Sequence, residues 1–357
     1  IQRESVLFWD RTTGKALSKI ITWQDRRASD LAEKQLNYAA RVKTLSGLEL
    51  DPMFSALKAQ WLLENNNFNK SDICIGTIDS WIAFKLGAGH IVEVGSASRT
   101  QLLDIQSGNW SQELLSIFGI SESQLPRVCA SDEKHTCANM QLLGLTKDVP
   151  LSGIMGDSHA ALFAHQGWKA GLFKATFGTG TSLMGVTETK PQTIAWSIDN
   201  KITRAVEANI LSTGSTLVWL AELLGTTPDA LAKLATESRQ KVEIVPAFNG
   251  LGAPWWDREA TGIIAGLTRG SNRADLAAAA LRSTAAQIND VLEDFAKSNI
   301  EIDSLYADGG GARHAVDNVG DLDVVDCVQP RRAMADHAAA GTKALAQALD
   351  ANHGSHP

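Results

Sequence analysis

The sequence predicts an α/β protein with two domains. Its 357 residues exceed the roughly 100 to 200 residues of a typical domain, and 44% of them are hydrophobic, which is enough for two cores without disulfide or metal cross-links. Short, glycine-punctuated segments of strand composition alternate with segments whose apolar residues recur every three or four positions. This alternation favours sheets flanked by helices.

The first half of the chain begins with strand-like segments and continues mainly as helices. In chain order, it predicts strands at residues 5–10 and 20–23, helices at 29–41 and 53–63, and a buried strand at 151–155. A helix should start after Gly156, with Asp157 at the N-cap position. We place the domain boundary close to Gly167.

The second half opens with a hairpin and contains the longest helix. In chain order, it predicts a hairpin at residues 172–186, helices at 214–224 and 275–297, and a strand at 304–307. Asn272 and Asp275 are spaced to cap the start of the longest helix from both sides.

Charge and cysteine content limit the partners and the cellular compartment that we expect for this protein. The net charge of -7 does not favour binding of the protein as a whole to nucleic acid or to an anionic membrane. The longest apolar run, residues 276–281, is far shorter than the roughly 18 residues of a membrane span, and no signal peptide is recognisable at the start. Four scattered cysteines, Cys74, Cys129, Cys137 and Cys327, lack the spacing of a zinc site. We therefore expect a cytoplasmic protein with reduced thiols and neither nucleic-acid nor membrane partners.

Two glycine clusters are candidates for binding phosphate. The sequence contains neither the GxxxxGK[ST] loop nor a GxGxxG motif after a strand. Residues 178–180 and 309–311 follow predicted strands, and glycines let backbone N–H groups approach a phosphate closely. On local evidence alone, a tight hairpin turn explains residues 178–180 at least as well.

Several segments in order resemble the FGGY carbohydrate kinases, and within them the glycerol kinase-like branch. The segment MFSALKAQWLLEN at residues 53–65 follows the first family signature, and GIIAGL at 262–267 with residues 275–281 follows the second. Six further matches occur in family order: IQRES, ITWQDRR, GDSHAALF, FGTGTSLM, FNGLGAPWWD and DGGGAR. The resemblance extends from residue 1 to about residue 313.

The resemblance implies two actin/hexokinase-type (ribonuclease H-like) domains with an interdomain cleft. Residues 1–166 would form the N-terminal domain, lacking its first strands, with the substrate site and the catalytic base. Residues 167–357 would form the nucleotide-binding C-terminal domain. The implied reaction transfers the γ-phosphoryl group of ATP, with Mg²⁺, to a hydroxyl of a small polyol or sugar, and glycerol or a related polyol is the leading substrate.

The resemblance also assigns roles to residues of the first domain. Asp157 matches the catalytic base, which accepts the hydroxyl proton, and it could contact Mg²⁺; its local pattern alone indicates only an N-cap. Arg3 and Glu4 match a charged pair that hydrogen-bonds substrate hydroxyls. Trp23 matches an aromatic wall, although a core tryptophan explains it equally well.

Two further substrate positions depart from the glycerol kinase-like pattern. Met53 stands where these enzymes carry a tyrosine, and Ser158 stands where glutamine is usual. A thioether and a short hydroxyl would leave room for a polyol longer than glycerol.

The nucleotide side of the resemblance lies in the second domain. The residues expected to contact ATP are Gly178, Thr179, Gly180, Gly214, Gly309, Gly310 and His314.

Two alternatives remain open. The family normally begins with a strand and a DxGTT phosphate loop, which would precede Ile1 of this chain, so a truncated, non-catalytic remnant that binds ligand is one alternative. A ketopentose kinase of the xylulose type is the other, although the NQRE-type segment at residues 1–5 favours a polyol. Family members suggest a homo-dimer or homo-tetramer.

Overall fold

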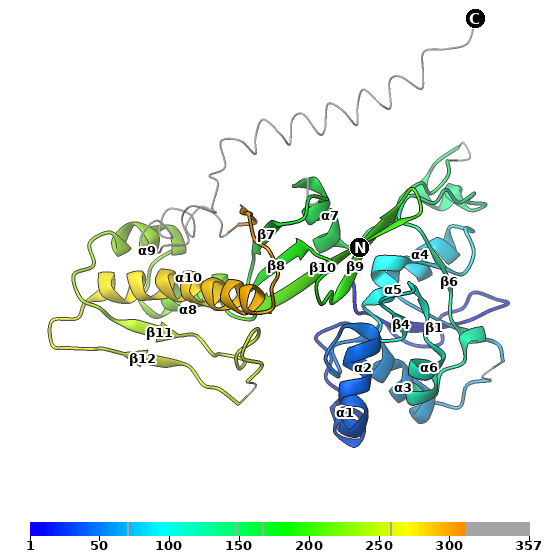
Figure 1. Cartoon of the computed structure of the whole chain (residues 1–357), viewed down its shortest axis with the longest axis horizontal. Coiled ribbons are helices and arrows are strands. Elements are labelled where there is room, and N and C mark those ends of the chain that lie inside the picture. Colours follow the sequence, from blue (N-terminus) through cyan, green and yellow to red (C-terminus); the bar gives the residue numbers. More distant parts are fainter. Residues whose placement is uncertain (70, 147–148, 166–167, 258, 311–357) are drawn as a thin grey trace, which may run out of the picture. The chain divides into compact units, whose positions relative to one another are not determined.

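The computed structural model describes residues 1–69, 71–146, 149–165, 168–257 and 259–310, and they form two compact units (Figure 1). The first unit consists of Ile1–Ala160 and Lys190–Val206, and the second consists of Ala161–Thr189 and the described residues from Glu207 onward. Strand β10 (Lys201–Ile210) therefore begins in the first unit and ends in the second. None of the described helices is both long and apolar enough to cross a membrane.

The first unit has short strands among many helices. Its helices and 3₁₀ turns are α1 (Ser29–Lys34), η1 (Leu36–Tyr38), α2 (Ala39–Ser46), α3 (Ser55–Asn65), α4 (Ile78–Lys85), α5 (Val94–Ser98), α6 (Gln112–Phe118), η2 (Glu122–Gln124) and η3 (Met140–Leu143). Its strands are β1 (Leu7–Asp10), β2 (Ile73–Gly76), β3 (Ile91–Glu93), β4 (Leu103–Asp104), β5 (Asn109–Trp110), β6 (Arg127–Cys129) and β9 (Thr193–Ile198). Helix α7 (Asp157–Ala164) begins in this unit.

Strand pairing in the first unit joins segments in small sheets. Strand β1 pairs antiparallel with β2, so that Phe8 lies opposite Ile75, and β3 pairs parallel with β6. Strand β9 instead pairs antiparallel with the first half of β10, at the edge of a five-stranded sheet.

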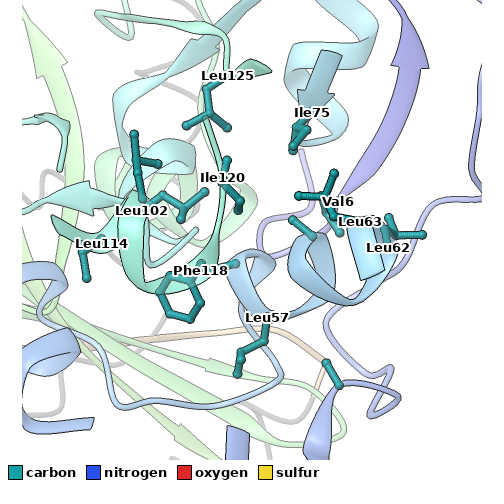
Figure 2. Close-up of a cluster of buried hydrophobic side chains, with 14 of the residues drawn as sticks. Val6, Leu57, Leu62, Leu63, Ile75, Leu102, Leu114, Phe118, Ile120 and Leu125 are labelled. Carbon is teal, nitrogen blue, oxygen red and sulfur yellow. The ribbon is translucent and has the colours of Figure 1, made fainter. Parts of the chain in front are cut away.

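The core of the first unit is formed around helix α3. Buried side chains from α3, β1, β2 and α6 meet there (Figure 2). Leu57 is fully buried, and Phe118 and Val6 belong to the same cluster. Burial of a leucine of this kind contributes about 1.5 to 3 kcal/mol, so this cluster packs α3 against β1.

The second unit is built on a mixed sheet. Its elements are β7 (Leu172–Phe177), β8 (Thr181–Val186), α8 (Gly214–Leu223), α9 (Pro228–Ala235), β11 (Glu243–Val245), β12 (Ile263–Ala265), α10 (Arg273–Lys297) and β13 (Ser304–Asp308). The strand order of this five-stranded sheet is β13-β7-β8-β10-β9, with β13 parallel to β7 and β7 antiparallel to β8. Helices α8, α9 and α10 share a separate apolar cluster.

Several sequence predictions are confirmed. The hairpin appears as β7 and β8, and α8, α10 and β13 lie where their patterns indicated. Asn272 accepts from the N–H groups of Ala274 and Asp275, while the Asp275 carboxylate accepts from the Asn272 N–H, which completes the predicted capping box.

Three predictions in the first unit are wrong in detail. Residues 20–23 form no strand, because Ile21 makes one isolated bridge with Val6 and β1 pairs instead with β2. The helix expected at residues 29–41 is divided into α1, η1 and α2. Residues 151–155 form neither a strand nor a buried segment: Leu151 makes a single bridge to His135, and the segment is partly exposed.

Candidate functional site

Arg3 and Glu4 lie buried just before β1. The Glu4 carboxylate accepts a hydrogen bond from Arg99 Nε at 2.7 Å, and the side chains of both residues are almost fully buried. Glu4 has a φ of 58°, a left-handed conformation that costs a non-glycine residue of order 1–3 kcal/mol and is enriched at functional sites. This strained, internally paired Glu4 is unlike a solvated strand end.

Arg3 connects this segment to the start of α7. Its Nη1 lies 3.2 Å from His159 Nε2, and its Nε lies 3.9 Å from Asp157 Oδ1. The Asp157 N–H also donates to the carbonyl oxygen of Ile1 at 2.9 Å. The structure therefore brings Asp157 to the segment of Arg3 and Glu4, although they lie at opposite ends of the first unit's main stretch of sequence.

Asp157 is the first residue of α7 rather than a residue before it. Its Oδ1 accepts from the Ser158 N–H at 2.7 Å, and its side chain is 68% exposed although the neighbouring Arg3 is buried. An exposed carboxylate beside a buried guanidinium can take up a proton from a bound hydroxyl. Ser158 is half-buried next to it.

Trp23 and Met53 lie on segments joined by one buried lysine. Trp23 is 40% exposed, which excludes the interpretation as a core tryptophan. Met53 is half-buried just before α3, where its N–H donates to Asp51 Oδ1. Lys58 of α3 donates to the carbonyl oxygens of Met53 and of Thr22, the residue before Trp23.

Three glycine-containing segments of the second unit meet at the turn between β7 and β8. The N–H groups of Thr213 and Ser215 donate to the carbonyl oxygen of Thr179 at 3.1 and 3.0 Å. A Cβ on Gly180 would lie within 3.0 Å of the Ile210 carbonyl oxygen, and one on Gly214 would lie as close to that of Gly178. Only glycine permits these approaches, so three backbone segments pack tightly at this hairpin turn.

Gly309 completes this glycine cradle. It has a φ of 88°, and a Cβ there would collide with the backbone of Phe177, the residue before Gly178. Gly178, Thr179 and Gly310 are exposed. An exposed, glycine-lined backbone surface of this kind fits the phosphates of a nucleotide. His314, the other residue expected to contact the nucleotide, lies outside the described residues.

A buried polar network beside the cradle was missed in the sequence. Lys174 of β7 is fully buried, and its Nζ donates to Thr176 Oγ1 at 2.9 Å. His165 lies 2.7 Å from Asp308 Oδ2 at the end of β13. Burial opposes ionisation of Asp308, but hydrogen bonds from His165 and Thr176 outweigh it and hold its pKa below the usual range. A lysine within the apolar strand segment LFKATF was the available signal.

One group of possible metal ligands occurs among the residues described. Cys129, Glu133 and His135 place one ligand atom each within 4.8 Å of one another. Two of the three carry other interactions: the Cys129 thiol donates to the Val92 carbonyl oxygen, and Arg127 contacts Glu133 at 2.6 Å. Burial raises the pKa of Cys129 to about 12, so its thiol stays protonated. We assign no metal to this group. Cys74 and Cys137 are free and buried, and Cys327 lies outside the described residues.

The two units and their polar clusters define a class of protein: two-domain kinases of the actin and hexokinase type. Phosphoryl transfer to a hydroxyl needs a group that accepts the hydroxyl proton and backbone donors that hold phosphate, and the exposed carboxylate at the start of α7 and the glycine cradle are candidates for these two roles. Comparisons with known proteins agree. Residues 1–164 match the N-terminal domain of the FGGY family of carbohydrate kinases, and residues 173–317 match its C-terminal domain.

Relatives of known name support the same family. A glycerol kinase of Geobacter sp. (strain M21) is 40% identical over 334 residues, covering 87% of this chain and 67% of the relative. A glycerol kinase of Enterococcus casseliflavus is 36% identical, covering 97% and 72%. The chain thus spans about two thirds of the length of these relatives.

Solved structures show the same fold. The crystal structure of Plasmodium falciparum glycerol kinase with ADP has a TM-score of 0.84 and 27% identity, covering 95% of this chain and 72% of that one. A xylulose kinase from Rhodospirillum rubrum has a TM-score of 0.80 at 19% identity, covering 92% and 71%, and shares the fold alone. The chain belongs to the FGGY family of carbohydrate kinases, which are phosphotransferases with an alcohol group as acceptor.

Proposed function

We propose that this chain phosphorylates a hydroxyl of glycerol with ATP as the phosphoryl donor. The observation that carries the proposal is the convergence of Arg3, Glu4 and Asp157 in one unit, because it places an ion-paired hydrogen-bonding group beside an exposed carboxylate. The named relatives, which are glycerol kinases at up to about 40% identity, support glycerol over a ketopentose.

Each polyol-side residue has a chemical role in this proposal. Arg3 donates to one hydroxyl of the acceptor and Glu4 accepts from its neighbour, so that a vicinal diol is held from one side. Trp23, which is partly exposed, covers the carbon chain. Met53 and Ser158 bound the far side of the pocket with small or flexible groups, which allows polyols somewhat longer than glycerol.

Asp157 acts as the general base. As a polyol oxygen bonds to the γ-phosphorus, the bond to the bridging oxygen of ADP breaks, and the hydroxyl proton passes to an Asp157 carboxylate oxygen. General-base assistance of this kind contributes about 10² to 10⁴-fold in rate. Mg²⁺, when bound, would neutralise charge on the transferred phosphoryl group, and Asp157 is the residue that we expect to face it.

The glycine cradle binds the nucleotide in this proposal. Gly178, Thr179 and Gly180 approach the phosphates, while Gly214, Gly309 and Gly310 lie on the adenosine side, with His314 as a further contact. The proposed domain boundary at residue 166 separates the acceptor-binding residues, which precede it, from the nucleotide-binding residues, which follow it.

We also propose that the protein is a cytoplasmic enzyme and that it forms a homo-dimer or homo-tetramer. Light scattering of the purified protein tests the oligomeric state.

The test is coupled ADP release with a panel of acceptors: glycerol, erythritol, xylitol, ribitol and xylulose. Turnover with glycerol and weaker turnover with xylulose is the expected result. A preference for xylulose would assign the ketopentose activity instead. No ADP release with any acceptor, from a protein that still binds polyol, would establish a ligand-binding remnant.

A further inference from the structure

Lys58 is a fully buried lysine in the middle of α3, and its ammonium group contacts three backbone carbonyls. Its Nζ donates to the carbonyl oxygens of Glu4 at 2.6 Å, Met53 at 2.6 Å and Thr22 at 3.0 Å. An ammonium group has three protons to donate, so these three acceptors complete its hydrogen bonding. A lysine with this burial and no directly bonded carboxylate is rare.

The three carbonyls come from three segments that are far apart in the sequence. Glu4 precedes β1, Thr22 lies in the loop before α1, and Met53 lies just before α3. Each carbonyl belongs to, or directly precedes, a proposed acceptor-binding residue: Glu4 itself, Trp23 and Met53. The ammonium group of Lys58 therefore links the three backbone segments that carry the proposed polyol-binding residues.

The charge of Lys58 is favoured by its surroundings although burial opposes it. Burial lowers the pKa of Lys58 to about 8, while the carboxylates of Glu4, Asp25 and Asp51 raise it and Arg26 lowers it. Near neutral pH the group is thus mainly an ammonium. Hydrogen bonds from a charged donor are about twice as strong as neutral ones, which suits a group that must hold three loops at fixed separation.

We propose that Lys58 is a positioning residue for the acceptor substrate, whose ammonium group holds the segments of Glu4, Trp23 and Met53 at the separation that the polyol requires. This inference rests on the proposed function of those three residues. Lys58 touches neither substrate in the proposal; it acts through the backbone carbonyls.

The experiment compares two Lys58 variants with a neighbour that shares the helix but not the role. Lys58→Leu removes all three donors, and Lys58→Gln keeps a shorter, neutral donor. Leu57→Ala is the matched control, because Leu57 is equally buried in α3 but faces the hydrophobic cluster shown in Figure 2. Thermal unfolding, KM for glycerol, KM for ATP and kcat are measured for each.

The Lys58→Leu variant should raise KM for glycerol by about 10 to 100-fold, the equivalent of one or two hydrogen bonds from a charged donor. Its KM for ATP should stay within about twofold of the value for the unmodified protein, which is a small change beside a tenfold effect. Lys58→Gln should fall between Lys58→Leu and the unmodified protein. Leu57→Ala should lower the unfolding temperature without raising KM for glycerol.

A structural measurement keeps the inference testable if glycerol proves to be the wrong acceptor. The ¹³C-methyl resonance of Met53, assigned with Met53→Leu, should shift and broaden in Lys58→Leu but stay in place in Leu57→Ala. Failure of the unmodified chain to use any polyol would contradict the proposed function while this resonance still reports on Lys58. An unshifted Met53 resonance, or equal changes in glycerol KM for Lys58→Leu and Leu57→Ala, would overturn the positioning role.

Discussion

Arg99 and Glu4 form an ion pair with Nε and Oε1 2.7 Å apart, although the two residues are 95 positions apart and almost fully buried. Arg99 follows α5, and its guanidinium carbon also lies 5.1 Å from the ring centroid of Phe54, just before α3. The pair therefore holds the Glu4 side chain, while Lys58 holds the Glu4 backbone carbonyl. Because the pair is buried and holds Glu4, its loss should lower the stability of the first unit and weaken substrate binding.

Replacing Arg99 by Leu should destabilise the first unit strongly. The substitution leaves the Glu4 carboxylate buried without this partner, and breaking a buried pair in this way costs about 3–5 kcal/mol. Urea unfolding followed by fluorescence measures the loss. Arg41→Leu is the control, since it breaks an equally short pair with Glu113 that is half-exposed, and it should leave the midpoint almost unchanged. Similar midpoints for the two variants would contradict the importance of burial.

Replacing Asp157 by Asn should abolish most turnover without unfolding the protein. The amide keeps the size of the side chain but cannot accept the hydroxyl proton, so kcat should fall by about 10² to 10⁴-fold. Steady-state ADP release and circular dichroism give the two readouts. Asp30→Asn, at a carboxylate of α1 outside the proposed site, should retain activity. Retained turnover in Asp157→Asn would remove this residue from the role of base.

The parts of the fold that were predictable have strong local signals. Asn272 and Asp275 form a capping box from residues three positions apart, and the β7–β8 hairpin follows from its apolar runs around a glycine turn. The failures lie where tertiary pairing overrides local pattern. Residues 20–23 have strand composition, yet β1 finds its partner in β2, which is far along the chain at residues 73–76.

The candidate site divides in the same way. Asp157 and the glycines of the cradle became candidates through the ordered family motifs, because their local patterns alone indicate an N-cap at Asp157 and a hairpin turn at residues 178–180. Lys58 and Arg99 could not be found, because a charged residue in an amphipathic or mixed segment is normally solvated and nothing local indicates a buried partner. For Lys174 the apolar strand segment LFKATF did offer a signal. Lys58 and Arg99 find their partners in distant segments, so only the folded structure reveals that these cations are internal.

The titration of Glu93, whose carboxyl group is fully buried at the N-terminus of α5, should make the stability of the protein depend on pH. Burial raises its pKa from 4.5 to about 7, although hydrogen bonds from Ser131 and from the N–H groups of Gly95 and Ser96 oppose this. Between pH 4.5 and 7 the folded state thus binds more protons than the unfolded state. The contribution of Glu93 is fully present below pH 4.5 and declines as pH rises through 7, by up to about 3 kcal/mol.

Glu93→Gln tests this assignment, because glutamine keeps most of the shape but does not titrate. Urea midpoints measured from about pH 5 to about pH 8 should decline less steeply in the variant than in the unmodified protein. Asp79 is also buried with a raised pKa, and its Oδ2 accepts from the Glu93 N–H, so a residual slope is expected from it. Parallel curves for the two proteins would show that Glu93 does not titrate in this range.

The glycine cradle yields the last prediction, at Gly180. A methyl group there would lie within 3.0 Å of the backbone carbonyl of Ile210, which cannot move without separating β10 from β8. Gly180→Ala should therefore displace the turn at residues 178–180 and raise KM for ATP more than KM for glycerol. Gly270→Ala, which meets only ordinary contacts at 3.6 Å or more, is the control and should change neither. Equal effects of Gly180→Ala on both substrates would indicate general destabilisation rather than a nucleotide-binding turn.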